Sequence, residues 1–182
     1  MILNFNLIVT TYKYKEKQLQ DELLELLREF GDPEPYFEIT SVSGILLVYT
    51  KIDPFEVVGK FKQLIYDTPW RIRYILRVIP VEVVVMTMIG EIRNGIKKLI
   101  LKMQDLDTFR ITIEKRHNDA LESSDIIKAI GNEIDNRVNL KNPDWIVLVE
   151  VVEQVAGISV LRSNQIFSSI VEKRNNALVS CN

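Results

Sequence analysis

The sequence contains very little cysteine, histidine and glycine, and each shortage excludes a class of site. Its 182 residues include one cysteine, Cys181, so the chain forms neither an internal disulfide nor a cysteine-rich zinc site. The single histidine, His117, excludes a three-histidine zinc site and an HExxH helix. The seven glycines lack the G-x-G-x-x-G spacing of a dinucleotide-binding loop. We therefore expect no catalytic residue, no metal and no cofactor.

Long apolar runs are also missing. No stretch approaches the roughly 18 uninterrupted apolar residues that span a bilayer. The first residues, MILNFNLIVTT, alternate apolar side chains with Asn4 and Asn6 and lack the basic start of a secretory signal. A single free cysteine fits a reducing compartment. We therefore expect a cytoplasmic protein with no membrane partner.

Charge is unevenly distributed along a chain of otherwise ordinary globular composition, 47% apolar and 26% charged. The net charge is −2, yet residues 71–116 carry ten basic and five acidic side chains. Residues 1–70 carry seven basic and eleven acidic side chains, and residues 117–182 carry six and nine. A local basic excess is typical of a polyanion site if it folds onto one face. The alternative is a set of solvated charges spread over several elements.

The first half of the chain alternates between strand and helix patterns. Apolar side chains recur every second residue in some stretches and at helical spacing in others. The expected elements are a strand at 2–10, a helix at 16–30, a hairpin at 36–40 and 45–50, a helix capped by Asp53, and a strand at 72–79. This βαββαβ order is typical of a ferredoxin-like subdomain, which we expect over residues 1–79.

The second half continues the alternation. The expected elements are a helix at 82–103 with Val84 and Met88 in its buried stripe, a strand at 108–116, a helix capped by Ser123 or Ser124 and ending near Val138, strands at 145–152 and 156–161, and a short helix at 164–173. Val147 and Val149 should be buried, because their strand is apolar on both faces. The predicted fold class is therefore α/β (α+β), with two subdomains packed side by side and a C-terminal helix and tail at 166–182.

Three motifs in the second half resemble the THUMP domain. They are FRITIEKRHN from Phe109, SSDIIKAIGNEI from Ser123, and VNLKNPDWIVLVEVVEQVAGISVL from Val138. The similarity covers roughly residues 82–165, so we expect a THUMP domain over residues 80–165. Within this family, the chain looks most like the stand-alone proteins that act as tRNA-binding adaptors of the tRNA cytidine acetyltransferase.

The resemblance implies a function as well as a fold. Such adaptors hold the acceptor end of tRNA, and because this chain ends soon after Leu161 we expect no catalytic domain. We therefore expect a tRNA-binding adaptor that is not an enzyme, with cytidine N4-acetylation by a separate RNA acetyltransferase as the modification it serves. Two alternatives stay open: a small tRNA-modifying enzyme with an unrecognised site, and an assembly component whose basic patch binds an acidic protein.

Twelve residues are candidates for RNA contact, because Arg, Lys and polar loop side chains supply most phosphate contacts. They are Arg71, Arg73, Arg77, Arg93, Lys97, Lys98, Lys102, Arg110, Lys115, Arg116, His117 and Asn118. Arg110 and Arg116 share the polar face of one strand, and a groove would form if Arg93 and Lys97 lay beside them. The alternative is that these cations form ion pairs inside the protein.

Overall fold

The structure is a computed structural model that describes residues 4–117 and 121–179. It contains two compact units. The first unit comprises Asn4–Pro80 and the C-terminal segment from Asn164, and the second unit comprises Val81–Ser163. The C-terminal segment therefore belongs to the same unit as the start of the chain. Among the described residues, no helix is both long enough and apolar enough to cross a membrane.

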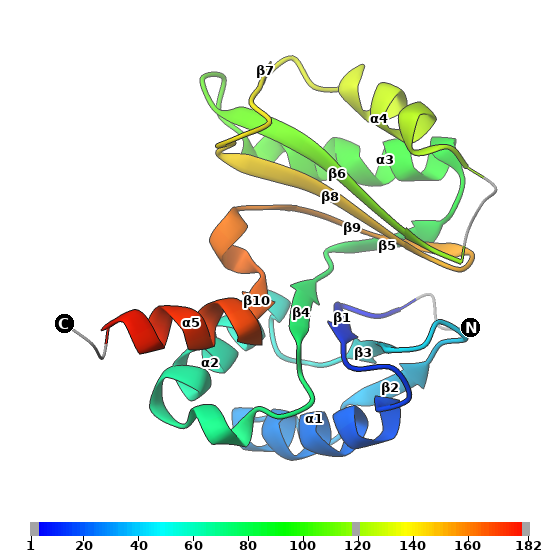
Figure 1. Cartoon of the computed structure of the whole chain (residues 1–182). Coiled ribbons are helices and arrows are strands. Elements are labelled where there is room, and N and C mark those ends of the chain that lie inside the picture. The colour runs from blue at the N-terminus through cyan, green and yellow to red at the C-terminus, as the bar shows by residue number, and fades with distance from the viewer. Residues whose placement is uncertain (1–3, 118–120, 180–182) are drawn as a thin grey trace. The chain divides into compact units, whose positions relative to one another are not determined.

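The first unit is built on an antiparallel sheet with helices on one face (Figure 1). Its strands lie in the order β10-β4-β1-β3-β2. Their bounds are Leu7–Thr10 (β1), Tyr36–Ile39 (β2), Ile45–Tyr49 (β3), Arg77–Pro80 (β4) and Phe167–Ser168 (β10). The helices are Glu16–Phe30 (α1), Pro54–Asp67 (α2) and Ser169–Val179 (α5), with a 3₁₀ turn at Pro69–Arg71 (η1). Leucines of α1 and apolar residues of α2 share one core with β1 and β3.

Local sequence signals set the ends of both large helices. The α1 helix stops at Gly31, which adopts a left-handed conformation with φ of 113° that glycine tolerates best. The α2 helix starts after Asp53, whose carboxylate accepts hydrogen bonds from the backbone N–H groups of Phe55 and Glu56 at 2.9 and 3.0 Å. Both predicted helices are confirmed.

The strand predicted at residues 72–79 is wrong in extent, since β4 includes only Arg77–Pro80. The cause lies in Glu22 on α1. Its carboxylate accepts hydrogen bonds from the backbone N–H groups of Arg73, Tyr74 and Ile75 at 3.1 to 3.2 Å. These donors are satisfied by a side chain rather than by a neighbouring strand, so the segment is not drawn into the sheet.

The second unit is a mixed sheet in the order β5-β9-β8-β6-β7, covered on one face by two helices (Figure 1). Its strands are Val83–Met86 (β5), Thr108–Arg116 (β6), Arg137–Val138 (β7), Trp145–Val152 (β8) and Val155–Leu161 (β9). Its helices are Ile89–Leu99 (α3) and Ser123–Gly131 (α4), with 3₁₀ turns at Ile100–Lys102 (η2) and, just after β9, Ser163–Gln165 (η3). In the part of the chain that the structure describes, the parallel pairs are β6 with β7 and β6 with β8. Val147 and Val149 are fully buried, as predicted.

The long helix predicted from residue 82 is also wrong at its start. Residues Val83–Met86 form β5 and pair with β9, while α3 begins only at Ile89. The spacing of Val84 and Met88 fits a helical stripe, but consecutive β-branched valines favour a strand when a partner strand is available. Met88 is accordingly exposed rather than buried.

Two further boundaries differ from the prediction. The α4 helix ends at Gly131 instead of near Val138, and neither Ser123 nor Ser124 caps it, because its N-cap residue is Glu122. The last predicted residues of that helix instead pair with β6 as the short strand β7. The helix expected at 164–173 is likewise wrong at its start, because Phe167–Ser168 form β10, which pairs with β4, and α5 begins only at Ser169.

Candidate nucleic-acid interface

Helix α3 carries three basic side chains on its exposed surface. Arg93, Lys97 and Lys98 are exposed, and we call these three residues the α3 basic face. The carboxylate of Glu133, in the turn after α4, lies 3.4 Å from Arg93 Nε and 3.6 Å from Lys97 Nζ. Lys98 has no hydrogen-bond or ion-pair partner among the residues that the structure describes. The α3 basic face thus carries three cations beside one carboxylate.

The predicted groove between Arg110, Arg116 and the α3 basic face does not form. Ile111 and Ile113 of β6 pack against the core beneath α3 and α4. Side chains alternate along a strand, so Arg110 and Arg116 lie on the opposite face of the sheet. Lys115 lies on the same face of β6 as Ile111 and Ile113, and its ammonium donates a hydrogen bond to the carbonyl oxygen of Leu121 at 2.6 Å. The sheet itself separates the two groups of cations.

Arg116 is held by carboxylates of its own sheet. Its Nη2 donates to Glu114 at 2.8 Å and lies 3.6 Å from a carboxylate oxygen of the buried Glu150. Glu114 and Glu150 are direct neighbours on β6 and β8, where two like charges would repel each other. Arg116 relieves this repulsion. Arg110 lies further along the same face, near the start of β6, and donates to the carbonyl oxygen of Leu140 at 3.5 Å.

Three further candidates lie in the first unit. Arg71 donates to both carboxylate oxygens of Glu29 at 3.0 and 2.5 Å, and this hydrogen-bonded pair holds the pKa of Glu29 below its ordinary value. Arg73 is exposed and donates from Nε to the carbonyl oxygen of Trp70 at 3.3 Å. Arg77 is half-buried on β4. The structure therefore divides the predicted cations between two compact units.

The remaining candidates lie at two chain turns of the second unit. The ammonium of Lys102 contacts the carboxylate of Glu82 and donates to the carbonyl oxygen of Val160 at 3.3 Å. His117 is exposed directly after β6, with a left-handed φ of 52°. Asn118 lies outside the described residues. Of these three candidates, His117 is the one that the structure places, exposed, directly after the end of a strand.

The basic excess of residues 71–116 is partly neutralised by acidic side chains from elsewhere in the chain. Glu25 and Glu29 contact Arg71, Glu133 contacts the α3 basic face, and Glu150 contacts Arg116. Each of these carboxylates comes from one of the two acidic segments of the sequence. The charge segregation along the chain therefore overstates the basic surface of the folded protein.

Sequence reasoning missed Arg162, which follows β9 and contacts Trp145 at the start of β8. The guanidinium carbon of Arg162 lies 4.3 Å from the ring centre of Trp145, and the Trp145 indole N–H donates to Asp107 at 2.7 Å. The backbone N–H of Gln104 and this indole hold the pKa of Asp107 below its ordinary value. The one available signal was the position of Arg162 directly after a predicted strand, and nothing nearby in the sequence identified its partner.

The motif at residues 139–144 acts as a structural turn. The side-chain oxygen of Asn139 accepts hydrogen bonds from the backbone N–H groups of Lys141 and Asn142 at 3.2 and 3.1 Å. Asp144 accepts from the backbone N–H and the hydroxyl of Thr108 at 2.8 and 2.7 Å, which lowers the pKa of Asp144. These bonds link the start of β8 to the start of β6.

A family model described as "THUMP domain" matches residues 88–161. THUMP domain-containing protein 1 from Bos taurus is 26% identical over 125 residues, a stretch that covers 64% of this chain and 35% of that relative. The Homo sapiens protein of the same name is 24% identical, again over 64% of this chain and 35% of the relative. The chain thus matches about a third of the length of these curated relatives.

Two solved structures share the fold over both units. The crystal structure of PH1313 from Pyrococcus horikoshii has a TM-score of 0.67 and 20% identity, and the match covers 87% of this chain and 55% of that one. A 4-thiouridine synthetase, crystallised in complex with RNA and ATP, has a TM-score of 0.57 and 16% identity, and the match covers 87% and 42%. Neither unit alone makes up 87% of the chain, so both matches extend across the two units.

Proposed function

Residues 88–161 match a family model of the THUMP domain, and from this premise we propose that the protein binds tRNA and acts in tRNA modification. The family match is the observation that carries the proposal. The similarity of fold to a 4-thiouridine synthetase that was crystallised with RNA supports it. The candidate contacts are mainly Arg and Lys side chains, which bind phosphates, so we expect recognition of RNA by shape and phosphate position rather than by base sequence.

The α3 basic face is the strongest candidate for phosphate contact. Arg93 and Lys97 stand four residues apart, so their charges point in similar directions on one exposed side of the helix. Lys98, the next residue, is also exposed but is turned about 100° further around the helix. The side chains of Arg93 and Lys97 are each 49% exposed, and Glu133 leaves them free to contact a second anion because exposed ion pairs are weak. His117 stays a predicted contact at the end of β6.

Salt dependence tests this proposal directly. Anisotropy of fluorescently labelled tRNA, measured from about 50 to about 200 mM salt, should show affinity falling steeply, because bound cations release counterions from the phosphates. The double variant K97A/K98A should lower the salt slope by about one unit for each lost phosphate contact. Arg137, exposed on β7, supplies the control variant R137A. Affinity that is absent, or unchanged across this salt range, would contradict tRNA binding.

We further propose that the protein is an adaptor rather than an enzyme and that it works in the cytoplasm. In this role it presents the acceptor end of tRNA to a separate modifying enzyme such as an RNA acetyltransferase. The resemblance of the second half to stand-alone THUMP adaptors supports the proposal. The purified protein should produce no modified nucleoside from tRNA with acetyl-CoA, ATP or S-adenosylmethionine until the modifying enzyme is added. Modification by the protein alone, detected by mass spectrometry, would identify it as an enzyme instead.

A further inference from the structure

The first unit contains a cavity of about 430 Å³ that the THUMP domain does not include. One wall is the polar side of α1, with Asp21, Glu22 and Glu25, and the other wall is the segment around η1, with Trp70, Arg71 and Arg73. A volume in the range of roughly 300–1,000 Å³ is typical of sites that bind a small ligand or a protein side chain.

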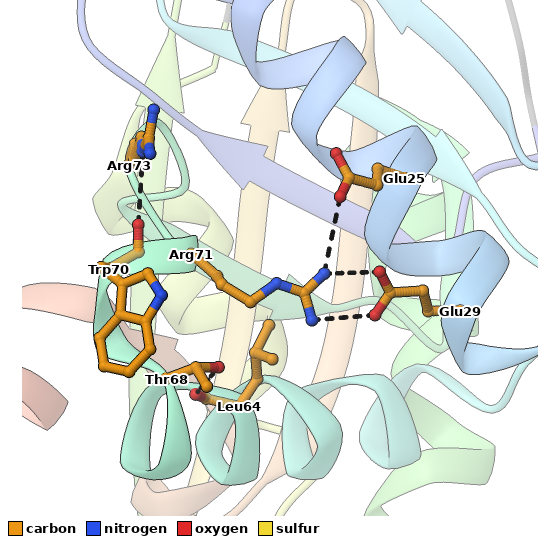
Figure 2. A network of polar contacts seen from close by, with 7 residues as sticks. All are labelled: Glu25, Glu29, Leu64, Thr68, Trp70, Arg71 and Arg73. Carbon is orange, nitrogen blue, oxygen red and sulfur yellow. Dashed lines mark hydrogen bonds and ion pairs between the residues drawn. The ribbon is translucent and has the colours of Figure 1, made fainter.

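Two sets of contacts hold the cavity walls together. Arg71 on η1 reaches across to α1, where it pairs with both oxygens of Glu29 and lies 3.6 Å from Glu25 (Figure 2). Glu22 on α1 accepts three backbone N–H groups from residues 73–75. A cavity whose walls are already ordered loses little conformational entropy when a ligand enters.

Trp70 gives the cavity an aromatic surface. Trp70 follows Pro69 in η1, and its side chain lines the cavity. The residue is 66% exposed. An exposed indole face attracts cations through its negative π-electron density, and a planar guanidinium can also stack on it. The backbone carbonyl of Trp70 accepts a hydrogen bond from Arg73, which ties the tryptophan to the following turn (Figure 2).

The charge balance of the cavity favours a cation. Three lining carboxylates face two lining guanidinium groups, and Arg71 pairs most closely with Glu29, which does not line the cavity, at 2.5 Å against 3.6 Å for Glu25. Asp21 contacts Lys17 at 3.0 Å, but both side chains are more than 60% exposed, so an incoming cation can replace this weak pair. A phosphate group would instead be repelled by the carboxylates of Asp21 and Glu25, which are exposed and form only weak ion pairs with Lys17 and Arg71.

We propose that this cavity binds an arginine side chain presented by a partner protein. The guanidinium stacks on Trp70, and its N–H groups donate to the carboxylates of Asp21 and Glu25. The first unit would then bind a protein while the second unit binds RNA. This inference stands on the cavity alone and does not depend on tRNA binding.

The two tryptophans of the chain make the proposal measurable by NMR, because a ¹⁵N-labelled sample of the full chain has two indole N–H signals. The variant W70F assigns them. The probe is the peptide Gly-Gly-Arg-Gly-Gly with blocked ends, and the matched probe replaces arginine by the neutral isostere citrulline. The arginine peptide should shift the Trp70 signal saturably and leave that of Trp145 unchanged. The citrulline peptide should bind at least about fivefold more weakly.

Variants then separate the cavity from the rest of the unit. The double variant D21N/E25Q should weaken the arginine peptide about fivefold or more, while E34Q, which removes an exposed charge outside the cavity, should not change its affinity. An unchanged Trp70 signal, or equal binding of the two peptides, would overturn the proposal. Tighter binding of oligouridine than of the arginine peptide at Trp70 would assign the cavity to RNA and also overturn it.

Discussion

Arg162 stacks on Trp145, with its guanidinium carbon 4.3 Å from the centre of the indole ring. Arg162 follows the last residue of β9, and Trp145 is the first residue of β8, so this contact joins the end of one strand to the start of its antiparallel neighbour. The ring is fixed by its hydrogen bond to Asp107, which leaves the guanidinium a rigid surface to stack on.

Removal of the guanidinium should therefore destabilise the second unit. The variant R162A is expected to lower the free energy of unfolding by about 0.5–2 kcal/mol, the usual value of a cation–π contact. Urea denaturation measures this change. R137A removes the same charge from an exposed position on β7 and should change stability by less than about 0.5 kcal/mol. Equal stability of R162A and the parent would show that the stacking contributes nothing.

Glycine is required at position 44 by both conformation and space. Gly44 has a φ of 85°, and a Cβ atom there would lie 2.9 Å from the carbonyl oxygen of Thr11. We expect G44A to cost about 1–3 kcal/mol of stability. The opposite effect on stability is expected at Gly59, which is exposed within α2. A Cβ atom added there would have no neighbouring atom within 4 Å, so G59A should raise the free energy of unfolding by about 0.5–1 kcal/mol. Thermal melting should show a lower melting temperature for G44A and a higher one for G59A than for the parent.

Asp32 makes the stability of the first unit depend on pH. Its buried carboxylate accepts hydrogen bonds from Thr50, Lys51 and Glu34 at 2.6, 3.0 and 3.3 Å. Burial alone would raise the pKa of Asp32, but these hydrogen bonds outweigh burial and lower it. A lowered pKa in the folded state means that protons bind the unfolded state first, so this stability is present at neutral pH and is lost as pH falls through the folded-state pKa.

The variant D32N should therefore be less stable than the parent by about 1–3 kcal/mol at neutral pH, and the difference should shrink below about pH 4. Chemical denaturation at several pH values measures it. The exposed residue Glu34 provides the control variant E34Q. A difference that stays constant down to about pH 2 would show that the carboxylate charge is not what Asp32 contributes.

Glu133 should limit RNA affinity, because it neutralises part of the α3 basic face. If Arg93 and Lys97 contact phosphate, the variant E133Q should bind tRNA about two- to fivefold more tightly at low salt, and the gain should fade as salt rises. D105N removes one exposed negative charge from the turn after η2 and is the matched control. Weaker or unchanged binding by E133Q in anisotropy titrations would place the phosphate contacts elsewhere.

The elements predicted correctly are those where several local signals coincide. In α1, leucines at helical spacing are followed by Gly31, which ends the helix. In α2, apolar residues at helical spacing follow Asp53, which caps the helix start. The central strands β6 and β8 were predicted because their apolar residues form long, unambiguous patterns. By contrast, β5 carries a pattern compatible with both helix and strand, and only its pairing with β9 decided between them.

The candidate site was predicted less well, because charge in the sequence does not show where its counter-charges lie. Arg71 and Glu29 are 42 residues apart, and Arg116 and Glu150 are 34 apart, yet each pair is in contact. The α3 basic face could be predicted from helical spacing. Its separation from Arg110 and Arg116 could not, because that depended on which face of β6 the helices cover.

The sequence by itself determined the motifs that resemble the THUMP domain, the alternation of strands and helices, and the helix ends set by Asp53 and Gly31, because these depend on residues close together in the chain. Only the tertiary structure decided that Glu22 would satisfy the backbone of residues 73–75, that carboxylates from distant segments would neutralise much of the basic stretch, and that Trp70 would line a cavity beside α1. The physical reason is that hydrogen bonds and ion pairs depend on distance in space, and folding brings together groups that the chain keeps far apart.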